Sequence, residues 1–379
     1  MSAMPVEPIP IRVALIGGYA AAYRAGYMAQ ALMSRPSLFI VTARAPSWYR
    51  WPRRGKASGL LPLLWAIRAV LNADTVVFTA VFHFNQRYRL LLKLARLLRK
   101  RVVVDFYISH FDSSVRERKV VPMGSRAARS MLEGDRAAIR SGTPTLFLSD
   151  AERDYYSQLL DVQPLRGNAK KLRLVIPERP LAQLPFVQGQ TTSPCVAWWG
   201  RLGNPLHGVD VIMEALRGLQ ETTGGKYRIM FFPSGEPLQV KAFSDQASDI
   251  PNCSVNTTAA MENGELLETL RTEVDVALGV FGGTEKARIV PINKVIEAMA
   301  MGIPCITGDS AAFNEDVAPG ALRFVGHGDT HALAQAVEEL VGRPEAMVSQ
   351  GRKARDQWRA LYSPEAFEKA FVDVMGSQR

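Results

Sequence analysis

The chain has 379 residues, of which 47% are hydrophobic, and it carries a net charge of +10. This length suggests two domains, and the composition is that of a globular protein with enough apolar residues for two cores. The three cysteines lie far apart and form no Cys-x-x-Cys or Cys/His cluster, which argues against a disulfide framework and a structural zinc site.

The N-terminal stretch MSAMPVEPIPIRVALIGG has no basic segment followed by an apolar one, so it does not have the pattern of a signal peptide. The longest apolar runs, such as ASGLLPLLWAI, are too short to span a bilayer. We therefore expect a cytoplasmic protein. Its positive charge is compatible with binding phosphorylated small molecules, nucleic acid or anionic lipid. The sequence contains no nucleic-acid-binding motif, so we expect no nucleic-acid partner.

Short apolar runs alternate with helical stretches along the first half of the chain. The runs are RVALIGG, LFIVTAR, DTVVFTAV, RVVVDFY, TLFLSD and LRLVIP. Apolar strands that alternate with helices are typical of a parallel sheet covered on both faces. The first half is therefore predicted to be a doubly wound α/β domain.

A glycine turn follows the first of these strands, in ALIGGYAAAYRAGYMAQAL. It contains Gly17 and Gly18, but the spacing to the next glycine, Gly26, does not match the dinucleotide fingerprint G-x-G-x-x-G. The turn is either purely structural or part of a ligand site at the carboxyl end of the strand.

Polar side chains follow the strand RVVVDFY. Asp105, Ser109, His110 and Asp112 come at or just beyond its carboxyl end, where doubly wound sheets bind ligands. Such residues also cap loops and turns, so a functional and a structural interpretation are both open. His83, after the strand DTVVFTAV, is a weaker candidate of the same kind.

The stretch RYRLLLKLARLLRKRVVV is a basic, amphipathic helix that leads into a strand. It could dock on anionic lipid. We favour the alternative that it covers the sheet with its leucines and keeps its arginines in water, because the following strand requires a covering helix.

The pattern of strands then starts again. The second series is CVAWWG, YRIMFFPSG, CSVNTT, VDVALGV, PCIT and LRFV, with helical stretches between them. Between the two series, residues 181–193 lack a clear period and are predicted to be a linker. We expect an N-terminal domain over residues 1–185 and a C-terminal domain over residues 186–379, with the last helix free to return to the first domain.

The stretch WWGRLGNPLHGVDVIMEAL reads as a strand, a glycine loop and a helix. Gly200 and Gly208 allow the backbone to approach a ligand closely, and Arg201 can bind two phosphate oxygens. His207 could donate to a phosphate or to a sugar hydroxyl. A glycine-rich turn of this kind is by itself a weak signal.

Glu297 lies inside an otherwise apolar helix in IVPINKVIEAMAMGIPCITGD. A buried carboxylate needs hydrogen-bond donors, and a ribose diol offers two. Lys286, Arg288 and Lys294 supply positive charge nearby, and the start of the helix suits a diphosphate. On residue types alone, a solvent-exposed Glu297 on an amphipathic helix is equally acceptable.

Together these two stretches resemble the retaining glycosyltransferases of family 4, which have the GT-B fold. The matching residues are Gly200-Arg201, Gly208, Glu214-Ala215 and the run from Glu297 to Pro304. Two positions depart from the family pattern: Ile289 replaces a glutamate, and His207 replaces a lysine. The resemblance is to a variant in which the glycine turn reads P-L-H-G and the loop contains Phe281, Gly282, Thr284, Lys286, Pro291 and Lys294.

The resemblance implies two Rossmann-like domains that face a central cleft, with helices at the C-terminus. It also implies that the C-terminal domain holds a nucleoside-diphosphate sugar (UDP- or GDP-linked) and that the N-terminal domain holds the acceptor. Transfer would be retaining and independent of metals and cofactors, with Asp105, His110, Arg201 and Lys286 as catalytic candidates. The donor-binding candidates are Gly17, Gly18, Gly200, His207, Gly282, Lys294 and Glu297.

The acceptor is expected to be a small molecule or a lipid-linked glycan, in cell-envelope or natural-product (antibiotic) biosynthesis. A lipid-linked acceptor would add peripheral contact with the inner face of the membrane. Three alternatives are open: a nucleotide-sugar epimerase on the same fold, a non-catalytic nucleotide-sugar-binding protein, and an NAD-dependent oxidoreductase, which the irregular turn at Gly17 disfavours.

Overall fold

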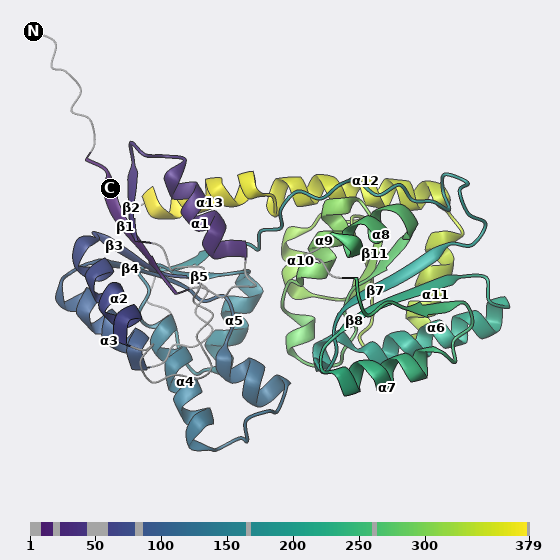
Figure 1. Ribbon diagram of the computed structural model, residues 1–379, viewed down its shortest axis with the longest axis horizontal. Coiled ribbons are helices and arrows are strands. Elements are labelled where there is room, and N and C mark those ends of the chain that lie inside the picture. Colours follow the sequence, from purple (N-terminus) through teal and green to yellow (C-terminus); the bar gives the residue numbers. More distant parts are fainter. Residues whose placement is uncertain are drawn as a thin grey trace, which may run out of the picture. The chain divides into compact units, whose positions relative to one another are not determined.

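The computed structural model describes residues 9–17, 23–43, 60–79, 86–163, 168–259 and 264–376. The chain divides into two compact units (Figure 1). The first unit contains residues 1–175 and 364–379, and the second contains residues 176–363.

The first unit is built on a six-stranded parallel sheet with the order β2-β1-β3-β4-β5-β6. Its strands are β1 (Ile11–Ile16), β2 (Phe39–Ala43), β3 (Thr75–Phe78), β4 (Arg101–Asp105), β5 (Thr145–Phe147) and β6 (Ala169–Lys171). Its helices are α1 (Tyr23–Met33), α2 (Leu60–Asn72), α3 (Gln86–Leu97), α4 (Arg126–Ile139), α5 (Asp150–Leu159) and α13 (Pro364–Gly376).

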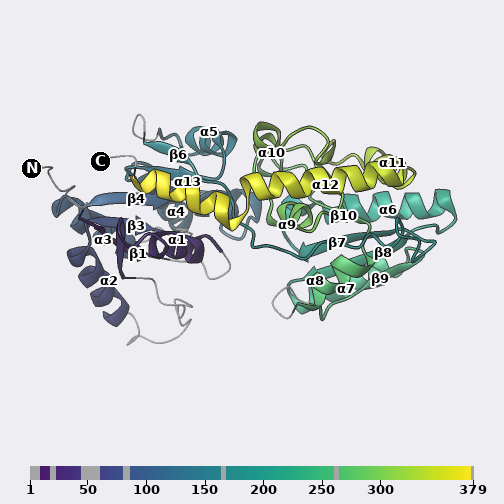
Figure 2. The same ribbon diagram turned by 90° about the horizontal axis from the view of Figure 1, so that it is seen from above.

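Helices cover both faces of this sheet, as the continuous apolar strands require. On one face, α1 and α13 pack together and bury Leu32, Phe367 and Phe371 against Val13 and Val77 (Figures 1 and 2). On the other face, α2 and α3 lie side by side. Because α13 joins the core of the first unit, the chain leaves this unit after Val175 and returns to it at Pro364.

The second unit has another six-stranded parallel sheet, with the order β12-β11-β10-β7-β8-β9. Its strands are β7 (Cys195–Arg201), β8 (Arg228–Ser234), β9 (Cys253–Val255), β10 (Val276–Leu278), β11 (Cys305–Gly308) and β12 (Arg323–Val325). Its helices are α6 (Val209–Thr223), α7 (Pro237–Ala247), α8 (Glu265–Glu273), α9 (Asn293–Met301), α10 (Ala311–Asp316), α11 (Thr330–Val341) and α12 (Pro344–Leu361). The predicted two-domain α/β architecture is confirmed.

One predicted strand is displaced. The last strand of the first sheet, β6, ends just before the run LRLVIP, which was predicted to be the strand. In this run, the carbonyls of Leu172 and Arg173 accept hydrogen bonds from the Arg24 side chain and not from a neighbouring strand. The structure also divides the chain after Val175, whereas the sequence prediction places the boundary after residue 185. The intervening segment bonds to the second unit through Ala182 N–H to the Met301 carbonyl (2.9 Å) and Gln183 N–H to the Arg271 carbonyl (2.8 Å).

No helix in the described part of the chain is both long enough and apolar enough to cross a membrane.

Candidate functional site

Two loops meet at the carboxyl ends of the central strands β7 and β10 of the second sheet. The Phe281 and Gly282 N–H groups donate to the carbonyls of His207 (3.0 Å) and Leu206 (3.1 Å). Gly208 has a φ of +59°, and a Cβ atom there would lie 2.4 Å from the Gly282 nitrogen. Glycine is therefore required at position 208, both for the left-handed backbone and for this contact. Backbone hydrogen bonds thus join the glycine loop directly to the loop after β10.

His207 is held within the glycine loop. Its Nδ1 atom lies 2.8 Å from the Arg201 carbonyl, and its ring stands edge-on to Trp198 with 5.7 Å between the ring centroids. A carbonyl oxygen can only accept, so Nδ1 carries the hydrogen and the tautomer of the ring is fixed. The same turn leaves the Arg201 side chain exposed at the end of β7, without an ion pair to any residue that the structure describes.

Lys294 is the most unusual cation in this region. It is on the first turn of α9 and only 6% exposed, and its Nζ atom lies 4.0 Å from the centroid of the Trp198 ring. This Nζ atom has no hydrogen-bond partner among the described residues. A Cβ atom on Gly200 would lie 2.7 Å from it, so the absence of a side chain at Gly200 makes room for the ammonium group. Burial lowers the pKa of Lys294 well below its usual value, and the negative charge of Glu297 opposes this only in part.

Glu297 is one turn further along α9 and is buried, not exposed to solvent. The Trp199 indole N–H donates to its Oε2 atom (3.3 Å), and the Arg179 guanidinium lies 3.6 Å from its Oε1 atom. Burial raises the pKa of Glu297, whereas Arg179 and Trp199 act to lower it. A carboxylate has about four acceptor positions, so these two partners leave capacity for a ligand hydroxyl.

Sequence reasoning did not find Arg179. Its backbone carbonyl accepts a hydrogen bond from Arg355 of α12 (2.9 Å), and a second donor of Arg355 binds the carboxylate of Glu178 (2.9 Å). The indole N–H of Trp358 also donates to the Ile176 carbonyl (3.2 Å). Arg179 is in an irregular segment without a repeating pattern, so nothing in the sequence marks it as a neighbour of Glu297.

The remaining candidates of the second unit lie on the loop after β10. Lys286 is buried, 4% exposed, in a short 3-10 turn that spans Lys286–Arg288. Ile289, at the position of the missing glutamate, ends this turn, and its carbonyl accepts from the Ala312 N–H (3.1 Å). The structure thus brings Gly200, His207 and Lys294 together, places Glu297 further along α9, and puts Gly282 and Lys286 on the adjoining loop.

In the first unit, Asp105 is in an ion pair. It is 0% exposed, and Arg24 binds it with two hydrogen bonds, Nη2 to Oδ1 at 2.6 Å and Nε to Oδ2 at 3.1 Å. The Arg24 guanidinium also lies over the rings of Tyr107 (5.9 Å) and Phe367 (5.4 Å). Asp105 therefore joins β4 to α1 through a buried ion pair, and its catalytic role stays a prediction.

His110 is half-buried at the start of a helical turn that continues as a π-helix, Asp112–Glu117. Asp135 holds this turn, because its carboxylate accepts from the Ser109 hydroxyl (2.6 Å) and the Phe111 N–H (2.9 Å). Burial raises the pKa of Asp135 to about 6.

Gly17 has a φ of +97°, and a Cβ atom there would lie 2.9 Å from the Thr79 carbonyl oxygen, so this tight turn requires glycine. Gly18 and His83 lie outside the described residues.

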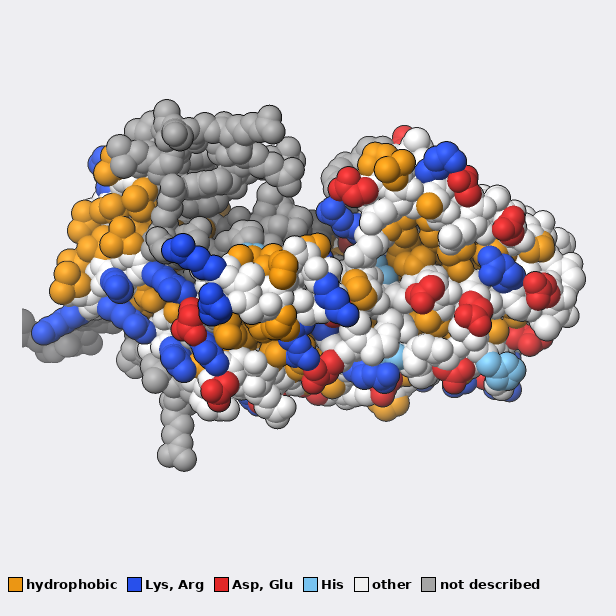
Figure 3. All heavy atoms as spheres, turned by 90° about the horizontal axis from the view of Figure 1, so that it is seen from below, with side chains coloured by type: hydrophobic (Ala, Val, Ile, Leu, Met, Phe, Trp, Pro, Cys, Tyr) orange, Lys and Arg blue, Asp and Glu red, His pale blue; other side chains and the backbone are white. Residues whose placement is uncertain are grey.

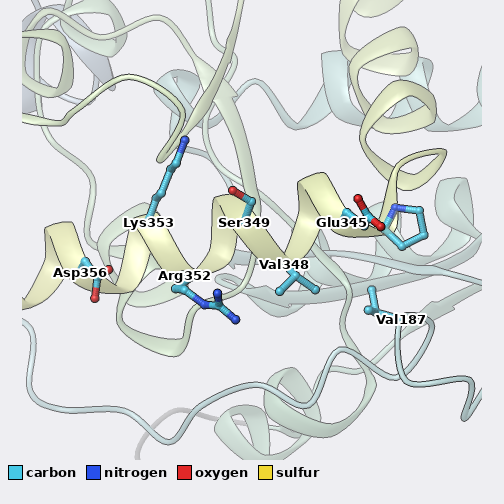
Figure 4. A pocket seen from close by; sticks show the side chains of 8 residues that line it. Val187, Glu345, Val348, Ser349, Arg352, Lys353 and Asp356 are labelled. Carbon is cyan, nitrogen blue, oxygen red and sulfur yellow. The ribbon is translucent and has the colours of Figure 1, made fainter.

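A surface groove of about 420 Å³ runs along α12 in the second unit (Figure 4). Its lining includes Val187 and the charged residues Glu345, Arg352, Lys353 and Asp356. None of the candidate site residues lines this groove. Its exposed cations are useful as controls for substitutions elsewhere.

The two parallel sheets with their covering helices define a GT-B protein, and the cations next to the glycine loop suit an anionic ligand. Residues 193–343 match the family described as glycosyl transferases group 1. No curated protein matches the chain in sequence.

Solved structures resemble nearly the whole chain. HepE from Anabaena, in complex with UDP and glucose, has a TM-score of 0.66 and 11% identity over 97% of this chain and 100% of its own. Sucrose-phosphate synthase from Thermosynechococcus elongatus has a TM-score of 0.66 and 14% identity over 97% and 98%. A UDP-N-acetylglucosamine 2-epimerase candidate from Listeria monocytogenes has a TM-score of 0.57 and 12% identity over 97% and 96%. At these identities the likeness establishes the fold, and the predicted GT-B fold is confirmed.

Proposed function

We propose that the protein is a glycosyltransferase that takes a sugar from a nucleoside-diphosphate sugar, UDP- or GDP-linked, with retention of the anomeric configuration. The observation that carries this proposal is the buried ammonium group of Lys294, on the first turn of α9. It lies beside Gly200 of β7 and has no hydrogen-bond partner among the described residues. A buried cation without an acceptor is costly, and a diphosphate supplies the missing negative charge and acceptor oxygens. The family match over residues 193–343 supports the same chemistry.

In this proposal the reaction depends on electrostatic stabilisation of the leaving group. The bond between the anomeric carbon and the phosphate oxygen breaks, and Arg201, Lys286 and Lys294 offset the charge that develops on the diphosphate. The acceptor hydroxyl forms the new bond on the same face of the sugar, and its proton goes to a phosphate oxygen. The chain's own cations provide the charge that a metal would otherwise provide, so we propose metal-independent transfer.

We assign donor binding to the second unit and acceptor choice to the first. The acceptor is proposed to be a small molecule or a lipid-linked glycan of cell-envelope or natural-product biosynthesis. The His110 turn, with its buried carboxylates, is the remaining catalytic candidate of the first unit. Asp105 is a positioning residue in this proposal, because Arg24 already neutralises it.

An epimerase is the second candidate, since an epimerase candidate from Listeria monocytogenes has a similar fold. Epimerisation would require an accessible carboxylate in the first unit, and the pairing of Asp105 with Arg24 makes that residue unsuitable. One experiment separates the two functions. The full-length protein is incubated with UDP- and GDP-sugars, with and without acceptors, and the nucleotides and sugars are followed by NMR. Acceptor-dependent release of nucleoside diphosphate supports transfer, whereas an altered sugar on an intact nucleotide supports epimerisation.

The substitution Glu297→Gln should weaken nucleotide binding. The amide side chain would keep the shape of the carboxylate but lose charge-assisted acceptance from the ribose, at a cost of about 1.5–3 kcal/mol, or roughly 10- to 100-fold in dissociation constant. Calorimetric titration with UDP and GDP measures this change. The conservative substitution should leave the fold intact. Unchanged affinity for both nucleotides would remove Glu297 from the donor site.

Replacing Lys294 with methionine should have opposite effects on stability and on binding. Removing a buried, unpartnered ammonium group should raise the free energy of unfolding by about 1 kcal/mol or more, while nucleotide affinity falls roughly 10- to 100-fold. Because the pKa of Lys294 is lower in the folded protein, the unfolded chain binds more protons, and the native protein gains stability as the pH rises. The stability advantage of the methionine variant should therefore shrink as the pH rises.

Thermal melting at several pH values and nucleotide titration test both effects of this variant. The exposed residue Lys353 of α12 provides the control, because Lys353→Met removes the same charge from a solvated position. A Lys294→Met variant that binds nucleotide normally would contradict the role that we assign to this residue.

A further inference from the structure

Two neighbouring helices of the first unit share an unusual exposed surface. It consists of Leu64, Arg68 and Leu71 on α2 and Leu90, Lys93 and Leu97 on α3, and we call it the α2–α3 surface. In each helix a cation lies between two leucines at helical spacing, so the three side chains form a stripe along one face. The two helices pack side by side, so the two stripes lie on adjoining helices.

The exposed leucines are not needed to cover the sheet. Helix α3 already buries Leu91, Leu92 and Ala95, and α2 buries Ala66, Ala69 and Val70. Yet Leu64, Leu71 and Leu90 are each about half exposed (52%, 51% and 50%), and Leu97 is 80% exposed. Single exposed leucines are common, but several on two adjoining helices indicate a surface with a partner. Helix α3 thus covers the sheet with Leu91 and Leu92, as the sequence predicted, and in addition leaves Leu90 and Leu97 exposed.

The charge around these leucines has one sign. Between Glu7 and Asp105 the sequence contains one acidic residue, Asp74, against sixteen lysines and arginines. The carboxylate of Asp74 is already engaged by Arg12, through hydrogen bonds of 2.7 and 3.1 Å. Arg68 and Lys93 are exposed and form no ion pair with any residue in the described ranges. Figure 3 shows hydrophobic and basic side chains next to one another over the end of the first unit that carries α2 and α3.

We propose that the α2–α3 surface docks the protein on an anionic phospholipid bilayer. A polyanion such as RNA would be bound by the cations alone and would leave the leucines in water. An apolar protein partner would leave the unpaired cations unexplained. An anionic bilayer satisfies both features, because its headgroups attract lysine and arginine while its acyl chains accept the leucines. This inference does not depend on the proposed glycosyl transfer.

The test measures sedimentation of the full-length protein with vesicles, in the absence of any nucleotide sugar. Vesicles of equal parts phosphatidylglycerol and phosphatidylcholine should bind the protein, and vesicles of phosphatidylcholine alone should not. Raising the salt concentration should weaken binding, since the Debye length falls from about 10 Å at 0.1 M to about 3 Å at 1 M. Failure to bind the anionic vesicles, or equal binding to both kinds, would overturn the proposal.

Two double variants test the two components of the surface. Arg68→Gln with Lys93→Gln should weaken vesicle binding roughly 30-fold, at about fivefold for each cation. Leu71→Gln with Leu97→Gln should weaken it at least about tenfold, because each change removes a leucine from the acyl region. All four residues are exposed, so the melting temperature of each variant should stay near that of the unmodified protein.

The second unit offers matched controls. Arg352→Gln with Lys353→Gln removes two exposed cations from α12, and Leu238→Gln removes a leucine from α7 that is 83% exposed. Both should bind anionic vesicles like the unmodified protein. If the control cations matter as much as Arg68 and Lys93, binding is non-specific and the proposal fails. The variant with Leu71→Gln and Leu97→Gln gives a second test. If it binds anionic vesicles and heparin as well as the unmodified protein does, the surface recognises polyanions and not a bilayer, and the proposal fails.

Discussion

Replacing Asp105 with alanine should lower the free energy of unfolding by about 3–5 kcal/mol, because the variant leaves the Arg24 guanidinium buried without its carboxylate. Arg24 is only 1% exposed, so water can compensate little for the loss. Its contacts with the Leu172 carbonyl and the Phe367 ring connect the segment after β6 and helix α13 to α1, so the damage should extend through the first unit. Chemical denaturation monitored by circular dichroism measures the loss.

Asp74 provides a matched control for this substitution. It also pairs with an arginine, Arg12, but the two side chains are 43% and 53% exposed. Exposed ion pairs contribute about 0–1 kcal/mol, so Asp74→Ala should change stability little. An Asp105→Ala protein that is as stable as the Asp74→Ala protein but inactive would return Asp105 to the catalytic role that the sequence suggested.

Replacing Arg201 with lysine should reduce sugar transfer by roughly 100-fold or more. A guanidinium binds two phosphate oxygens at once, and lysine offers one point charge in place of this planar fork. Loss of a group that stabilises charge in the transition state typically costs about 100- to 1,000-fold in kcat. Because Arg201 is exposed at the end of β7, the substitution should not change the melting temperature.

Steady-state measurement of kcat and KM for the donor distinguishes the two roles that Arg201 can have. A lower kcat at similar KM identifies stabilisation of the leaving group, whereas a higher KM alone identifies ground-state binding. Arg352→Lys on α12, an exposed arginine outside the proposed site, should leave both constants unchanged. Full activity of the Arg201→Lys enzyme would place Arg201 outside the diphosphate site.

The fold could be predicted because its strands are buried on both faces. Runs such as CVAWWG and VDVALGV are almost wholly apolar, and their alternation with helices specifies a parallel sheet without knowledge of any contact. The glycine loop could also be predicted, because glycines between a strand and a helix are typical of a tight turn, and Gly208 has the left-handed φ of +59° that favours glycine. Local rules were sufficient wherever the chain's own backbone imposed the constraint.

Long-range pairs of side chains could not be predicted. Arg24 is an ordinary helix residue in the sequence, and its partner Asp105 comes 81 positions later at a strand end that resembles a ligand site. Likewise, burial of Glu297 was only one of two equal interpretations, because the Trp199 and Arg179 side chains that accommodate it are distant in the sequence. Residue type at a strand end gives the position of a polar group, but only the folded chain shows which partner it has.

The return of α13 to the first unit has a consequence for the order of events during synthesis. Arg24 and Asp105 leave the ribosome early, but Phe367 and Phe371, which complete their core, follow only after residues 176–363. At about 5–20 residues per second, that interval lasts roughly 10 to 40 seconds. During this interval the second unit can finish folding, while one face of the first sheet still lacks α13. The nascent chain therefore exposes that apolar face to chaperones and to aggregation for longer than a sequential pair of domains would.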